Sequence, residues 1–137
     1  MKYLMMVKTY PNTEAGRRYE SGAPPDPELI AAIGKHAEEA TKAGVLLSTA
    51  GLLPSAHGAQ VRATKGRVIV TDGPFIESKE LIGGFAMIEA GSKEEAIEMG
   101  KAFMKIHVDV LGPTYEGELE IRQMAHAGTC GTEPEQH

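Results

Sequence analysis

Three side chains stand out as groups that could move protons: His36, Asp72 and His107. A histidine titrates near neutral pH, so when partly buried it can serve as a general acid or base, and a neighbouring carboxylate can orient it. His36 is the best candidate base, because it lies at the margin of an apolar helical stripe. His107 follows Phe103 by one helical turn and is the second candidate. The chemistry these groups could support is a proton abstraction, as in an elimination or an isomerisation of a small organic substrate.

Each of these residues also has a structural interpretation. Asp72 precedes Gly73-Pro74, a tight turn that could hold a carboxylate rigidly at a sheet rim. Alternatively, the carboxylate could accept hydrogen bonds from backbone N–H groups of its own turn. His36 could sit at the edge of an apolar face with its polar tip in water. His107 could equally be a structural side chain at a helix end. The sequence leaves both interpretations open for all three.

Four further residues are candidate contacts for a substrate: Tyr3 and Ser55 as polar groups, and Phe75 and Phe85 as apolar ones. No histidines are spaced three or four residues apart, and no cluster has metal-ligand spacing, so we predict no metal site. The glycine motifs of nucleotide-binding loops are also missing, so we expect no cofactor. A non-catalytic ligand-binding or accessory protein is the alternative function.

Composition limits the class of protein. The chain has 137 residues, enough for one domain, and 42% are hydrophobic, which argues against general disorder. A net charge of −5 disfavours nucleic-acid binding, and the single cysteine cannot form an internal disulfide. No apolar run approaches the roughly 20 residues that span a membrane, and the N-terminal apolar stretch is too short for a signal peptide. We therefore expect a cytoplasmic protein that binds neither membranes nor nucleic acid.

The pattern of apolar residues predicts the elements that position these side chains. Helices are expected to begin at Asp26 and at Ser92, each a helix-capping residue. Residues 9–25 read as a long loop, or one with a short helical turn. The order strand, helix, strand, hairpin, strand, helix, strand indicates an α+β sandwich of the ferredoxin-like βαββαβ kind with an inserted β-hairpin. A single domain should span residues 1–124, followed by a flexible tail at 125–137. The expected strands are residues 3–8, 45–53, 81–89 and 115–124, with the hairpin at 59–64 and 67–71.

Two of these strands, residues 3–8 and 81–89, are apolar on both faces. In the ferredoxin-like order they are the central strands. Two helices can cover only one face of the sheet, so half of these apolar side chains would be left in water. Exposed apolar faces of several hundred Å² usually mark interfaces. We therefore predict a homodimer that pairs sheet to sheet.

The segment Thr71-Asp72-Gly73-Pro74-Phe75, with Gly83-Gly84-Phe85 and the helix start Ser92-Lys93-Glu94-Glu95-Ala96, resembles the DGPF-motif branch of the YCII-related family. The resemblance covers nearly the whole chain and implies a ferredoxin-like subunit that pairs into a dimeric α/β barrel. Some relatives are regarded as enzymes because a His–Asp pair lines a pocket, which here implies His36 and Asp72. Members of the DGPF branch often accompany sigma factors, which implies an accessory role in transcription regulation as the alternative.

Overall fold

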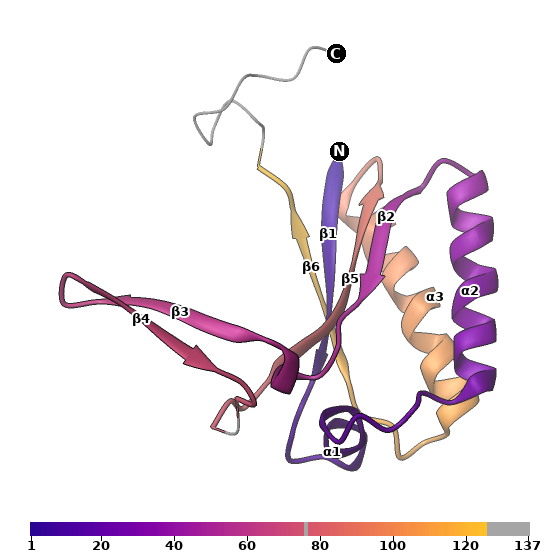
Figure 1. The fold of residues 1–137 in the computed structure, drawn as a ribbon. Helices are drawn as coiled ribbons and strands as arrows, with labels where there is room; N and C mark the ends of the chain where they lie inside the picture. The colour runs from indigo at the N-terminus through magenta and orange to yellow at the C-terminus, as the bar shows by residue number, and fades with distance from the viewer. Residues whose placement is uncertain (76, 126–137) are drawn as a thin grey trace.

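The chain builds a four-stranded antiparallel sheet in the order β2-β5-β1-β6, as seen in a computed structural model that describes residues 1–75 and 77–125 (Figure 1). The strands are β1 (Lys2–Thr9), β2 (Leu46–Gly51), β5 (Leu81–Glu89) and β6 (Glu118–Gln123). The two central strands are those whose side chains are apolar on both faces, so the predicted ferredoxin-like α+β order is confirmed. Of the predicted tail, all but residue 125 lies outside the described residues.

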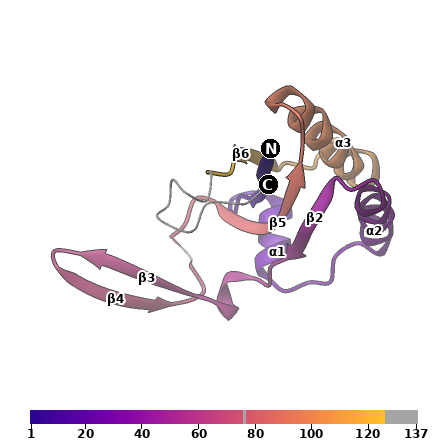
Figure 2. The same cartoon turned by 90° about the horizontal axis from the view of Figure 1, so that it is seen from above.

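Two helices, α2 (Pro27–Lys42) and α3 (Lys93–Leu111), lie on one face of this sheet (Figures 1 and 2). Both begin where the sequence predicts. The Asp26 carboxylate accepts hydrogen bonds from the backbone N–H groups of Glu28 and Leu29, and the Ser92 hydroxyl accepts one from Glu95. These caps satisfy N–H groups that have no partner inside a helix. No helix in the described residues has the length and apolar character needed to cross a bilayer.

The register of the strands decides which apolar side chains face the helices. Met5 of β1 lies opposite Ala86 of β5 and Ile121 of β6, and these three face α2 and α3. The neighbouring Met6 lies opposite Phe85, and both point to the other face. The buried core therefore forms on the helix side only. It consists of Tyr3, Met5, Ile88, Ala90 and Ala96.

The bounds of β1, β2 and β4 differ by one or two residues from those the sequence predicts. Two differences are larger. The loop expected at residues 9–25 contains the seven-residue helix α1 (Glu14–Glu20), which Thr13 caps by accepting a hydrogen bond from the Gly16 N–H. The last strand begins at Glu118 and not at Tyr115, because the Tyr115 ring stacks on His107 at the end of α3. Alternation of apolar residues did not reveal this contact, since it depends on a helix remote from the strand.

The predicted hairpin is present but stands apart from the sheet. Strands β3 (Ala59–Thr64) and β4 (Arg67–Asp72) pair only with each other, in a separate two-stranded sheet. The turn between them has positive φ at Lys65 (49°) and Gly66 (76°), the geometry of a tight hairpin turn. The short 3₁₀ helix η1 (Ser55–His57) precedes the hairpin. We call this hairpin, residues 59–72, the arm; it projects from the body on the side opposite α2 and α3 (Figures 1 and 2).

Candidate functional site

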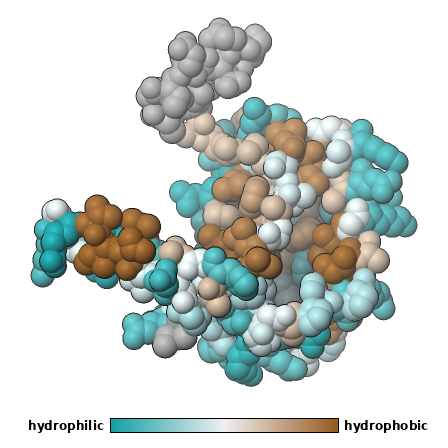
Figure 3. Space-filling model, in the orientation of Figure 1, coloured by the Kyte–Doolittle hydropathy of each residue, from teal (hydrophilic) through white to brown (hydrophobic). Residues whose placement is uncertain are grey.

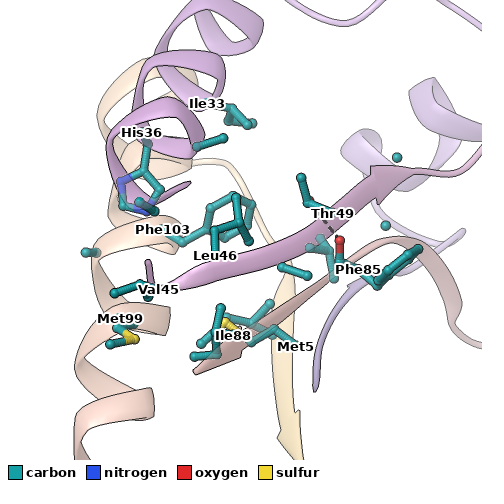
Figure 4. Close-up of a pocket in the computed structure, with 18 of the residues that line it drawn as sticks. Met5, Ile33, His36, Val45, Leu46, Thr49, Phe85, Ile88, Met99 and Phe103 are labelled. Atoms are coloured by element: carbon teal, nitrogen blue, oxygen red, sulfur yellow. Dashed lines mark hydrogen bonds between the residues drawn. The ribbon is translucent and has the colours of Figure 1, made fainter. Parts of the chain in front are cut away.

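A largely apolar cavity of about 660 Å³ lies between the two helices and the sheet. The surface is hollowed beside α2 in the space-filling view, and Figure 4 shows the side chains around the cavity (Figures 3 and 4). It exists because α2 buries none of its residues completely and presents the small Ala37 and Ala40 toward the small Ala86 on the sheet. Small groups facing one another leave room that larger ones would fill. The apolar lining includes Met5, Ile33, Val45, Leu46, Ile88, Met99, Phe103 and Leu119.

His36 lies on the wall of this cavity. It comes from the stripe of α2 that the sequence marked as the margin of the apolar face, and it is half-buried. Its ring is 6.2 Å from the ring of Phe103 on α3, centroid to centroid, and Figure 4 shows it pointing toward that helix. His36 is therefore at the margin of the apolar face of α2, and there it borders the cavity.

His107 also packs against Phe103, with ring centroids 4.9 Å apart, and lines the cavity. It is buried and stacks on Tyr115 at 5.3 Å. Burial lowers the pKa of His107 below its ordinary value, and a hydrogen bond to the Phe103 carbonyl only partly opposes this. Because a carbonyl oxygen can only accept, Nδ1 of His107 must carry the proton in this 3.1 Å bond. In the neutral ring, Nε2 is then left as an acceptor.

The other polar groups of the cavity are few, and sequence reasoning missed them. Thr49 donates its hydroxyl to the Phe85 carbonyl over 2.9 Å, and Glu95 and Glu98 line the cavity from exposed positions on α3. Glu95 and Glu98 lie at helical spacing from Ala102 and Phe103. This spacing could have predicted that both glutamates lie near the apolar face of α3. Glu98 forms an ion pair with Lys101 at 3.0 Å. Among the described residues, no carboxylate oxygen lies within 4.0 Å, the limit for an ion pair, of a ring nitrogen of His36 or His107.

Asp72 lies elsewhere, at the end of β4, exposed and opposite Ala59 in the arm. It does not line the cavity, so within one subunit the structure does not bring His36 and Asp72 together. The described residues give no support to the turn interpretation either. Pro74 has no N–H, and the Phe75 N–H donates to the Ser55 hydroxyl instead. In the described part of the chain, the Asp72 carboxylate makes no hydrogen bond.

The motif around Asp72 instead fastens the arm to the body. The Ser55 hydroxyl accepts from the Phe75 N–H over 2.9 Å and donates to the Glu20 carboxylate over 3.0 Å. Gly73 donates its N–H to the Gly58 carbonyl and passes so close to Ser55 that an added Cβ would lie 1.7 Å from the Ser55 carbonyl oxygen. Only glycine fits there. We call these contacts, made by Glu20, Ser55, Gly58, Gly73 and Phe75, the clasp.

The remaining candidate contacts divide between core, clasp and sheet. Tyr3 is 2% exposed and belongs to the core, and Ser55 and Phe75 belong to the clasp; none of the three lines the cavity. Phe85 does line it, through its main chain, whose carbonyl accepts from Thr49 (Figure 4). Its ring lies opposite Met6 on the other face of the sheet. Among the described residues, no group of three or more His, Cys, Asp or Glu side chains is placed to hold a metal ion.

The fold thus defines the class of protein: a ferredoxin-like α+β domain with an apolar cavity between its helices and its sheet. Residues 1–106 match the YCII-related domain, and the chain belongs to this family. It is similar to uncharacterized protein R00369 of Rhizobium meliloti (strain 1021), with 33% identity over 84 residues. That match covers 61% of this chain and 63% of the relative, so the chain spans less than two thirds of that protein's length.

Proposed function

We propose that the protein binds a small, mostly apolar organic molecule in the cavity between α2, α3 and the sheet. The observation that carries this proposal is the cavity itself, which at about 660 Å³ has the size of small-molecule sites and a nearly continuous apolar lining. His36, His107 and Thr49 line the cavity and are available to orient a ligand, and Glu95 and Glu98 line it from exposed positions. The atoms that line an open cavity lack partners for dispersion contacts on one side, and a bound apolar ligand would supply these contacts.

Binding is tested with the neutral apolar fluorophore N-phenyl-1-naphthylamine. The wild-type protein should bind it saturably, with one site per chain. Ala37→Phe places a ring in the cavity and should weaken binding at least tenfold, whereas Ala31→Phe, on the exposed side of α2, should leave binding unchanged. Equal binding by the two variants would contradict the proposed site.

We further propose that His36 can abstract a proton from the bound molecule, as in a cofactor-independent elimination or isomerisation. His36 is half-buried against Phe103 in an apolar wall, an environment in which a histidine can act as a base. His107, neutral and with Nε2 as an acceptor, is the second candidate. A catalytic role of Asp72 stays a prediction, and the contacts within one subunit do not support its pairing with His36.

A non-catalytic ligand-binding or accessory protein linked to transcription regulation is the second candidate. The observation that favours it is that no carboxylate is within ion-pair distance of either histidine in the described residues. Exchange of the α-protons of 1-tetralone in D₂O separates the two functions, because it needs only a base in an apolar pocket. Wild-type protein should accelerate exchange and His36→Asn should lose at least tenfold. Exchange no faster than in buffer would favour the non-catalytic function.

We also propose that two chains pair through the open face of the sheet, opposite the helices. Four half-buried apolar residues, from the two central strands, lie on this face: Leu4, Met6, Phe85 and Met87. Lys8 lies at one end, with its ammonium group 3.1 Å from the Glu80 carboxylate and 2.6 Å from that of Glu120. The charged end and the apolar centre together would fix the orientation of a partner sheet.

A further inference from the structure

The arm carries an apolar face that nothing in the described part of the chain covers. Residues directly opposite in an antiparallel pair share a face, so the pairs Val61–Val70 and Ala63–Val68 place four apolar side chains on the same side. We call these four residues the apolar face of the arm. Val61, Val68 and Val70 are 68%, 71% and 63% exposed. Figure 3 shows them as a hydrophobic cluster away from the body.

Few contacts in the described residues stabilise the arm while its apolar face is in water. A two-stranded hairpin by itself is marginally stable, and β3 and β4 pack extensively only on each other. The clasp fixes the base of the arm to the body through hydrogen bonds of Ser55 and Gly73. An exposed ribbon of valines is also a hazard for aggregation. These observations indicate that the apolar face is covered when the protein functions.

The distribution of charged residues indicates what covers the apolar face of the arm. The arm contains three basic residues, Arg62, Lys65 and Arg67, and one acidic residue, Asp72. The whole chain has 14 basic and 19 acidic residues, so the rest of it has 11 and 18 and is strongly acidic. A cationic arm on an anionic body is complementary to the body of another copy of the same chain. The arm also projects on the side of the sheet that the helices leave open, where a second copy would lie (Figure 2).

We propose that the arm embraces a second copy of this chain, with its apolar face packed on the partner and its cations against the partner's acidic surface. This inference rests on the proposed pairing through the open sheet face and adds a second, separate contact to it. In a two-fold dimer each subunit gives one arm and receives one, so every arm contact is made twice.

The experiment is sedimentation equilibrium on the full chain with three matched variants. Val68→Asp and Ile69→Asp place the same charge on neighbouring residues of β4 but on opposite faces of the arm. Met87→Asp places it on the open face of the sheet. We expect a wild-type dimer whose dissociation constant rises at least tenfold in Val68→Asp and less than twofold in Ile69→Asp. Circular dichroism melts establish that each variant folds.

Should Val68→Asp fail to fold, the double variant Lys65→Glu, Arg67→Glu at the exposed tip tests the same contact through charge. It should weaken the dimer and reduce its sensitivity to salt. A dimer that survives Val68→Asp but not Met87→Asp would overturn the arm contact and leave the sheet pairing intact. The reverse result would support the arm and contradict the sheet pairing. A wild-type monomer at 10 μM, or equal losses in the Val68 and Ile69 variants, would overturn the embrace.

Discussion

At the scale of single residues, His36 and His107 flank the same phenylalanine but differ in their surroundings. His36 is half-buried, whereas His107 is 7% exposed and bonded to a backbone carbonyl. The sequence placed both near the apolar face of their helices, because helical spacing alone fixes which side of a helix a residue occupies. It could not show that His36 lies beside Phe103, since that contact joins two helices far apart in the chain.

The lowered pKa of His107 predicts a pH-dependent stability. The unfolded chain binds a proton at the ordinary histidine pKa near 6.5, but the folded chain binds it only at lower pH. The contribution of neutral His107 is therefore fully present above about pH 6.5 and is lost as pH falls toward the lower folded pKa. His107→Phe keeps a ring beside Tyr115 but cannot titrate.

Urea unfolding at pH 7.5 and pH 5.5 checks this prediction. The wild-type protein should lose more unfolding free energy between these pH values than His107→Phe, by at most about 1.4 kcal/mol per pH unit. Carboxylates that titrate in the same range are common to both proteins and cancel in the difference. If the two proteins lose the same free energy, His107 is not held neutral by burial.

At the scale of elements, the sequence predicted the strands and helices but not how the arm is attached. Periodicity identified the central strands and the turn at Lys65-Gly66, because these depend on neighbouring residues. Ser55 was chosen as a substrate contact on its polarity alone. Its partners, Glu20 and Phe75, come from segments 35 and 20 residues away, and no local pattern signals such a contact.

Two glycine substitutions, one in the clasp and one in α2, should change the stability of the protein in opposite directions. Gly73→Ala would drive a methyl group into the Ser55 carbonyl, so it should destabilise the protein by about 1–3 kcal/mol. Gly34→Ala lies in open space in the middle of α2, where alanine is the better helix former, and should stabilise by about 0.5–1 kcal/mol. Both are measured by urea unfolding at pH 7.5. Equal stability of Gly73→Ala and wild type would show that the clasp is not tight.

At the scale of the whole molecule, the sheet separates two apolar regions with different uses. Its helix face borders the cavity. Its open face and the arm are the surfaces on which we propose that a partner chain packs. The sequence predicted that β1 and β5 are apolar on both faces. The register of the strands shows which of their residues lie on each face of the sheet. The cavity itself could not be predicted, because it depends on the small residues of α2 facing small residues of the sheet, and these come from segments far apart in the chain.

The methionines report on these two regions separately and give the most direct test of the proposed ligand site. Met5 and Met99 line the cavity, while Met6 and Met87 lie on the open face of the sheet. In a titration of methyl-labelled protein with N-phenyl-1-naphthylamine, followed by ¹H–¹³C NMR, the Met5 and Met99 methyl resonances should shift saturably and together. Shifts confined to Met6 and Met87, or none at saturation, would contradict the account of the cavity as the binding site.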